Sequence, residues 1–277
     1  MRNLLSSGFH RLWKDKIFWI GILAILVISV WTMMNGSRQS TAMMAEGYTR
    51  KLDDYYFNLA PLLGLFSAIF TSLFIGTEHS EGTMRNKIVV GRTRAEVYLS
   101  NYVVCFTAGV CFVVAWLIGG LVGIPTFGVW TIGFGGVLLY ALISIFFTAA
   151  LTGILTLLCM LSSNKAITTV VSIILALGLL VAASILYNSL GEPELNSGYV
   201  LTGTSVQMAE PTPNPNYVSG MTRTIYQFAI DCLPSGQAIL MANLEIGRPI
   251  LSLISSAVIS FVTTIAGIFA FRRKNLK

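Results

Sequence analysis

Charged residues are scarce in this chain of 277 residues. Asp, Glu, Lys and Arg together make up 11% of the sequence, whereas they make up about 25% of a typical soluble domain. Hydrophobic residues account for 55%, and the mean hydropathy is +0.74. So few charges could not cover the apolar surface of a soluble fold of this size. The composition therefore excludes a soluble domain and predicts an integral membrane protein.

The residues that carry most enzyme chemistry are also few. Of four cysteines, Cys105, Cys111 and Cys159 lie within apolar runs and only Cys232 lies outside, and there are two histidines. This pattern contains neither a disulfide framework nor metal-ligand spacing. The sequence has no glycine-rich phosphate loop, so we expect no ATP bound in that way and no cofactor on this chain. An enzyme is disfavoured too, because Asp231 is the only carboxylate expected near the outer ends of the spans and has no paired acid.

Six apolar runs are each long enough to cross a hydrocarbon core of about 30 Å as a helix. The expected spans are 17–34, 57–76, 97–123, 131–161, 166–187 and 249–271. We interpret Gly133, Gly135 and Gly136 as the point where the fourth run leaves an interfacial segment. The predicted fold is an all-α integral membrane protein with six transmembrane helices, and the first span is expected to be an uncleaved anchor.

The spans hold no Asp, Glu, Lys, Arg or His in their interiors. Ion-coupled carriers usually place ionisable groups within the membrane, where they are costly and therefore functional. This absence counts against a secondary transporter or an ion channel, although both remain alternatives, as does a membrane anchor or assembly factor.

Lysine and arginine divide unequally between the connections. Thirteen of the eighteen fall in the N-terminal segment, the 77–96 and 162–165 loops and the C-terminal tail, and five fall on the other side. Basic residues accumulate in cytoplasmic loops. Both termini are therefore expected to be cytoplasmic. The net charge of +6 reflects this bias, and no nucleic-acid partner is expected.

The N-terminal segment, 1–17, has the pattern of an amphipathic helix. Leu5, Phe9, Leu12 and Trp13 share one face, and the basic residues lie elsewhere. Such a pattern is typical of a helix in the membrane interface. A plain basic flank to the first span is the alternative.

The 77–96 loop concentrates charge and carries the signals of a short helix. Gly82 and Gly91 enclose TMRNKIVV (83–90), in which we expect Thr83 to be the N-cap. Met84 and Ile88 should form an apolar ridge, which suits docking in a groove of a cytoplasmic partner. Thr93-Arg94-Ala95-Glu96 has the form of a capping box for the third span. The alternative is that the basic residues only enforce topology.

The long outer segment, 188–248, divides into two halves. The first half is rich in Pro, Asn, Gly and Ser, and we expect it to be irregular. The second half has apolar helical spacing on both sides of Pro234-Ser235-Gly236, which predicts two short, re-entrant-like helices before the last span. We expect 221–245 to form an outer lid, and an ordinary packed loop is the alternative. The residues assigned to this lid are Phe228, Leu233, Pro234, Gly236 and Ile239.

The stretch E-H-S-E-G-T-M-R-N-K-I-x-x-G-x-x-R, from Glu78 to Arg94, resembles the first cytoplasmic loop of type-2 ABC transporter permeases, which are membrane subunits of bacterial exporters. LPSGQ (233–237) and the ending GIFAFRRKNLK are similar as well. The resemblance implies that 83–90 is the coupling helix that rests on an ATPase. Glu78 and Glu81 would help to fix its angle to the second span. The implied coupling residues are Glu78, Glu81, Gly82, Thr83, Met84, Arg85, Asn86, Lys87, Ile88 and Arg92.

The same resemblance implies the partners of the chain. These are two copies of an ABC ATPase subunit, which would hold ATP and Mg, a second permease copy or a paralogue, and the lipid bilayer of a bacterial plasma membrane. The chain itself would be a transport subunit and not an enzyme. The uncharged spans favour an amphipathic or apolar cargo, and in this family an antimicrobial peptide is one such cargo.

Overall fold

The computed structural model describes residues 1–44, 51–127, 131–196, 199–202, 205–208 and 210–274. Within this part of the chain, six helices are long and apolar enough to cross a membrane, as predicted. They are α2 (Lys16–Met44), α4 (Ala60–Ser80), α6 (Arg94–Gly120), α8 (Gly133–Leu161), α9 (Lys165–Gly191) and α12 (Pro249–Arg273). The chain is therefore a multi-pass membrane protein with an all-α spanning part.

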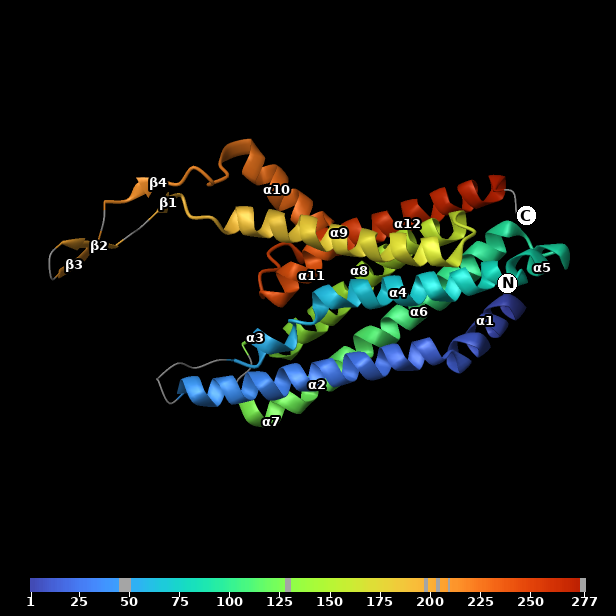
Figure 1. Ribbon diagram of the computed structural model, residues 1–277, viewed down its shortest axis with the longest axis horizontal. Coiled ribbons are helices and arrows are strands. Elements are labelled where there is room, and N and C mark those ends of the chain that lie inside the picture. The colour runs from blue at the N-terminus through green and yellow to red at the C-terminus, as the bar shows by residue number, and fades with distance from the viewer. Residues whose placement is uncertain (45–50, 128–130, 197–198, 203–204, 209, 275–277) are drawn as a thin grey trace.

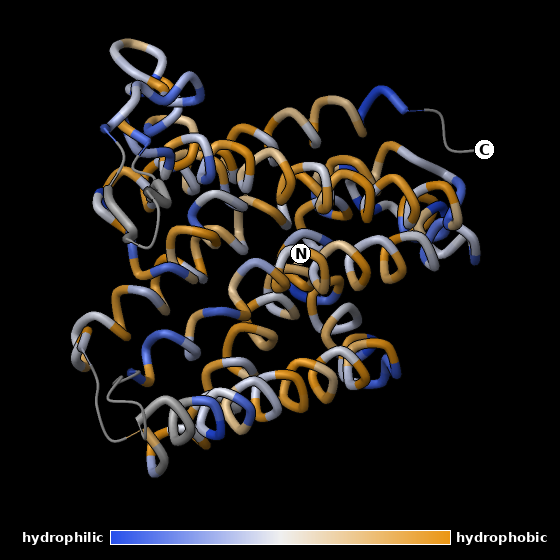
Figure 2. Tube along the Cα trace, turned by 60° about the vertical axis from the view of Figure 1, so that its left-hand side comes forward, coloured by the Kyte–Doolittle hydropathy of each residue, from blue (hydrophilic) through white to orange (hydrophobic). Residues whose placement is uncertain are grey.

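The six long helices run side by side, and the chain termini lie at the same end of the bundle (Figure 1). We name this end, with α1 (Arg2–Lys14), α5 (Thr83–Val89) and the last turn of α12, the terminal end. Hydrophobic residues follow the lengths of the helices, and hydrophilic residues gather near the ends (Figure 2). Arg50 and Lys277, which enter the predicted charge asymmetry, lie outside the described residues.

The opposite end carries the shorter elements that follow or precede the long helices. They are α3 (Asp53–Tyr56), the 3-10 turn η1 (Leu121–Gly123), α7 (Ile124–Phe127), α10 (Gly220–Cys232) and α11 (Pro234–Ala242), with β1 (Leu195–Asn196), β2 (Tyr199–Thr202), β3 (Ser205–Met208) and β4 (Thr212–Pro213). Strand β1 pairs antiparallel with β4, and β2 with β3. The first half of 188–248 is thus not wholly irregular, since two short strand pairs form within it.

Three helices form the centre of the bundle and three lie outside it. In the most apolar windows of the spans that contain α4, α6 and α8, 61%, 56% and 61% of the residues are buried, against 22%, 17% and 11% for α2, α9 and α12. Most of the side chains that α9 and α12 leave exposed are apolar, as is expected of helices that face lipid. Helix α12 packs mainly on α8, and α4 lies against both α8 and α9.

Aromatic and small residues hold the outer helices α2 and α12 against the central ones. Phe18 of α2, Phe70 of α4 and Phe112 of α6 have ring centroids 5.9–6.0 Å apart. Gly153 of α8 faces Thr263 of α12, so closely that an added Cβ would lie 2.4 Å from the threonine hydroxyl. Small residues of this kind let helices approach in a membrane, where packing and not water exclusion drives association.

The start of α8 lies at the first of the three glycines that the sequence singled out. Gly133 adopts a left-handed φ of 69° at the first position of the helix, and Gly135 and Gly136 continue the same helix without interruption. The glycines therefore begin the span, and an interfacial segment before them stays a prediction. The carboxylate of Asp53, in α3, accepts hydrogen bonds from the backbone N–H groups of Thr131 and Ile132 just before α8. This buried contact ties the first loop of the opposite end to the fourth span.

Candidate functional site

Helix α5 lies across the terminal end of the bundle between α4 and α6. Gly82 and Gly91 flank it with φ values of 67° and 92°, a left-handed conformation that glycine adopts without steric cost. The predicted short helix is confirmed, but its N-cap is Gly82 and not Thr83. The hydroxyl of Thr83 instead donates to the backbone oxygen of Glu78, 3.1 Å away. Two tight turns thus allow α5 to leave α4 and return to α6.

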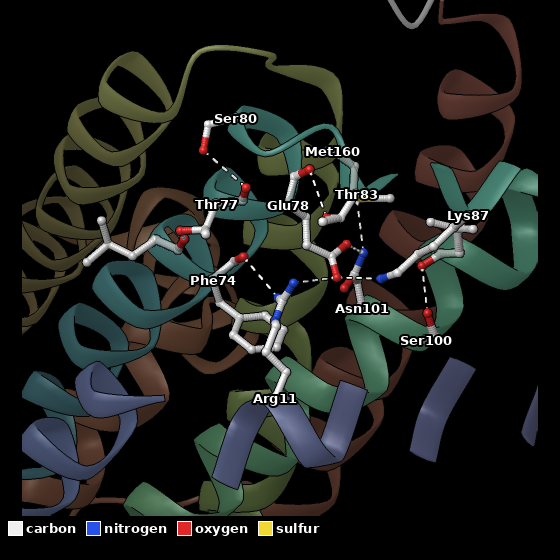
Figure 3. Close-up of polar contacts among 12 residues, drawn as sticks. Arg11, Phe74, Thr77, Glu78, Ser80, Thr83, Lys87, Ser100, Asn101 and Met160 are labelled. Carbon is white, nitrogen blue, oxygen red and sulfur yellow. Dashed lines mark hydrogen bonds and ion pairs between the residues drawn. The ribbon is translucent and has the colours of Figure 1, made fainter. Parts of the chain in front are cut away.

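The carboxylate of Glu78 is the hub of a polar network that joins four helices (Figure 3). Glu78 is 2% exposed at the end of α4. One carboxylate oxygen accepts hydrogen bonds from Arg11 of α1, at 2.6 Å, and from Lys87 of α5. The other accepts a hydrogen bond from the amide of Asn101 in α6, at 2.9 Å. A buried carboxylate with two cations and an amide is well compensated for the loss of water.

Arg11 holds α1 against the bundle through a second set of contacts. Its guanidinium donates to the backbone oxygen of Phe74 at 3.0 Å and lies 3.5 Å from the centroid of the Phe74 ring. Leu4 and Leu12 are buried on the same side of α1, whereas Trp13 is 50% exposed. The face that packs on the bundle therefore contains Leu4 and Leu12, whereas Trp13, which was expected to face the membrane interface, lies away from it. Placement of α1 in the membrane interface stays a prediction.

Helix α5 presents a different face to the outside than the sequence predicted. Met84 is 1% exposed and belongs to the core of the bundle, and Ile88 packs partly against that core. The expected apolar ridge of Met84 and Ile88 is therefore turned inward, because it is the side of the helix that anchors α5 to its own chain. Two valines are instead exposed at the end of the helix, Val89 by 77% and Val90 by 80%.

The remaining predicted coupling residues surround this tip. Arg85 and Asn86 are exposed on α5. Arg92 lines a cavity of about 310 Å³ with Lys87, Val90 and Leu4 of α1. Glu81 is exposed, and among the described residues it forms no ion pair, so the structure brings Glu78 but not Glu81 into the network.

A second set of contacts joins α6 to the end of α12. The predicted capping box is confirmed, since Thr93 and Glu96 exchange hydrogen bonds at the start of α6. Arg94 next to it donates to three terminal carbonyls, those of Phe271, Arg272 and Lys274. Lys274 in turn donates to the oxygens of Met160 and Ser162 at the end of α8, each at 3.0 Å, and burial lowers the pKa of its amine. Two cations thereby cap two helix C-termini, where cations are favoured.

Sequence reasoning missed Arg11, Asn101 and Lys274 as members of these networks. Asn101 offered a signal, because an amide within an apolar run usually bonds to another helix. Arg11 and Lys274 offered none, since their partners lie 67 and more than 100 residues away in the chain. In the described part of the chain, no three His, Cys, Asp or Glu side chains are placed to hold a metal ion.

At the opposite end, α11 is inserted into the bundle. All of its residues from Pro234 to Met241 are buried, and it packs against α4, α8 and α9. Gln237 is 0% exposed and donates to the backbone oxygens of Asp231 and Ser252, each at 3.0 Å. Its own oxygen accepts from the hydroxyl of Ser256 at 2.8 Å. Gln237, another residue that sequence reasoning did not single out, thus fixes α11 to α10 and α12.

The residues assigned to the outer lid do not share one environment. Pro234, Gly236 and Ile239 are buried in α11 or at its start, and Leu233 is partly buried between α10 and α11. Phe228 is 56% exposed on α10 and so lies apart from the buried residues of α11. A Cβ added at Gly236 would lie 2.2 Å from the backbone oxygen of Ile230, which makes glycine necessary at this crossing.

A comparison with known families covers most of the terminal end. A family model described as an ABC-2 family transporter protein matches residues 4–183, which include most of α1, all of α5 and every residue of the Glu78 network. No curated protein matches the chain.

Proposed function

Because the chain belongs to the ABC-2 family of transporter proteins, whose members are membrane-spanning permeases, we propose that a separate ATP-hydrolysing subunit docks on α5 and drives transport. ATP and Mg would bind to that subunit. The terminal end would face the cytoplasm of a bacterial cell, since it carries most of the basic residues.

The exposed tip of α5 is the observation that carries this proposal. Val89 and Val90 project from a helix that lies beyond the apolar spans, next to the exposed side chains of Arg85 and Asn86. Two adjacent exposed valines in a polar region are an unsatisfied apolar surface of the kind that a partner covers. The docking surface proposed here is therefore the Val89–Val90 tip, with Met84 and Ile88 as its anchor.

The Glu78 network supports a role for α5 in transmitting movement. Lys87 of α5 and Arg11 of α1 share one oxygen of Glu78, and Asn101 holds the other. A displacement of α5 would act on α1, α4 and α6 at once, because the same carboxylate joins all four helices. Two of these, α4 and α6, lie at the centre of the bundle.

We further propose that the working unit contains two permease chains, identical or paralogous, and two ATPase subunits, because one chain offers one α5. An amphipathic or apolar cargo, such as an antimicrobial peptide, suits the uncharged spans. The segment 221–245 would close the outer end of its path. The buried position of α11 among α4, α8 and α9 supports such a lid, since a movement of these helices would shift it.

The test places a charge on the proposed docking surface. We expect Val89→Asp with Val90→Asp to reduce co-purification of ATPase activity at least tenfold, because each valine would lose about 1.5 kcal/mol or more of apolar burial and a carboxylate would have to be desolvated. Ser6→Asp with Ser7→Asp, on the exposed side of α1, adds the same two negative charges at the same end and should retain the ATPase. The mass of the purified complex reports the number of permease and ATPase chains.

Undiminished ATPase binding in the double valine variant would show that the α5 tip is not the docking surface. Transport by the wild-type chain in vesicles without any ATPase would overturn the proposal as a whole and favour a secondary transporter. As a control for membrane insertion, the two ends of each variant must have the same protease accessibility as those of the wild type.

A further inference from the structure

A cavity of about 820 Å³ opens at the opposite end, between the last turn of α9, α10 and the turn that joins α11 to α12. Its volume is within the range of small-molecule sites, about 300–1,000 Å³. Leu190, Ile230 and Leu240 form apolar parts of the wall, and Glu192, Asp231 and Glu245 supply three carboxylates. This corrects the expectation that Asp231 is alone at the outer end.

Asp231 is the side chain in this cavity that lacks adequate partners. The residue is 8% exposed, and it lines the cavity. Among the residues that the structure describes, none donates a hydrogen bond to its carboxylate, and the nearest cation is Arg248 at 3.7 Å. Burial raises the pKa of this carboxyl, and Arg248 only opposes the shift. A nearly buried carboxylate without hydrogen bonds is costly, and a cationic group would remove much of that cost.

The other charged side chains around the cavity form hydrogen bonds with other groups or lie at its rim. Arg223 donates to the oxygens of Leu190 and Val218, where it covers the C-terminus of α9. Glu192 accepts a hydrogen bond from Asn214 at 2.9 Å. The side chain of Arg248 is 53% exposed and can turn toward water, and Glu245 lies exposed at the rim. With three carboxylates and two arginines, the lining carries a net charge of −1.

We propose that this cavity binds an amphipathic cation, with an ammonium or guanidinium group against Asp231 and an apolar chain against Ile230 and Leu240. The cation would displace Arg248 and would be steered by Glu245 at the rim. An anionic ligand would meet three carboxylates, and its natural partner Arg223 already donates to two backbone oxygens. Leu244 next to Glu245 holds a φ of 61°, a conformation that non-glycine residues rarely adopt and that often marks functional sites.

This inference deepens the proposed function, on which it rests for its meaning, because it names the charged group that a cargo or regulator at the outer end would carry. The binding itself requires neither an ATPase nor transport. A failure to bind would leave the α5 docking test untouched, and a failure of α5 docking would leave the cavity result standing.

The test is calorimetric titration of the full chain, in phosphatidylcholine nanodiscs, with octylguanidinium. Octanol and octanoate are controls that keep the chain length and replace the charge, and empty nanodiscs give the partitioning background. We expect saturable binding at one site per chain for octylguanidinium. Asp231→Asn should weaken it about tenfold or more, because the charge partner is nearly buried. Glu245→Gln should weaken it about threefold, as is typical of an exposed pair, and Glu210→Gln outside the cavity should not change it.

Equal binding of octanol, tighter binding of octanoate, or unchanged affinity in Asp231→Asn would overturn the proposal. If Asp231→Asn fails to fold, the affinity of the Glu245→Gln variant for octylguanidinium becomes the test, because an exposed glutamine cannot disturb the core. An unchanged affinity in that variant would overturn the proposal as well. A lipid headgroup could supply the same ammonium group. If phosphatidylethanolamine in the nanodisc competes with octylguanidinium, the site belongs to a lipid headgroup. If it does not compete, the site belongs to a free amphipathic cation.

Discussion

Two nearly buried carboxylates, Glu78 at the terminal end and Asp231 at the opposite end, have contrasting surroundings. Glu78 receives hydrogen bonds from Arg11, Lys87 and Asn101. Asp231 receives none from the described residues and has one cation at 3.7 Å. A fully partnered carboxylate fixes the elements that partner it, whereas an unpartnered one beside a cavity is available to a ligand. The two proposals follow this contrast: the terminal end would transmit movement, and the opposite end would bind a ligand.

The two ends also differ in how their short helices are held. Helix α5 is attached through the Lys87–Glu78 ion pair as well as the buried side chain of Met84, and its tip remains exposed. Helix α11 is attached through close packing and the neutral hydrogen bonds of Gln237. Ion pairs can break and reform as a surface helix moves, while a packed crossing moves only as a unit with its neighbours. We therefore expect the terminal end to respond to removal of charge and the opposite end to respond to added volume.

The largest loss of stability is expected from Glu78→Gln, which tests the terminal end. The variant removes both ion pairs and leaves Arg11 and Lys87 without their partner, which typically costs about 3–5 kcal/mol for a buried pair. Because both cations are partly exposed, we expect the low end, about 3 kcal/mol, seen as a lower melting temperature in nanodiscs. Glu81→Gln, three residues further along the chain and exposed, is the matched control and should melt like the wild type. Equal melting of the two variants would refute the structural role of the network.

A smaller loss of stability is expected from Gly236→Ala, which tests the opposite end. The added methyl group would meet the oxygen of Ile230 and force α10 and α11 apart, at a cost of about 1–3 kcal/mol. Gly178→Ala in α9 is its control, because nothing lies within 4 Å of the added atom. That change should instead stabilise the helix by about 0.5–1 kcal/mol. Melting temperatures of both variants in the same lipid measure the difference. A Gly236→Ala protein as stable as the wild type would show that the opposite end is not held by close packing.

The smallest effect on stability is expected from Asp231→Asn. Since burial raises the pKa of Asp231, the folded state binds its proton more tightly than the unfolded state does. The wild type should then lose stability as the pH rises from the ordinary carboxyl range through the raised pKa. Asp231→Asn should lack this loss and should melt at the same or a higher temperature at neutral pH. A clear drop in its melting temperature would mean that Asp231 is a structural carboxylate like Glu78.

Local sequence signals predicted the elements of the terminal end well. Apolar run lengths located all six spans, Gly82 and Gly91 enclosed α5, and Thr93 with Glu96 marked the start of α6. These features depend on neighbours within a few residues. The same reasoning placed Met84 on the outer face of α5, because periodicity shows that a face is apolar but not whether the chain or a partner covers it.

What the sequence by itself determined is therefore the class of the protein, its six spans and the site of a short helix between the second and third. The tertiary structure alone decided which atoms satisfy Glu78, where α11 lies, and that Asp231 lines a cavity. The physical reason is one of range. Helix formation and membrane insertion follow from the composition of about 20 adjacent residues. The partners of a buried charge come from segments far apart in the chain, and only the packed bundle brings them within hydrogen-bonding distance.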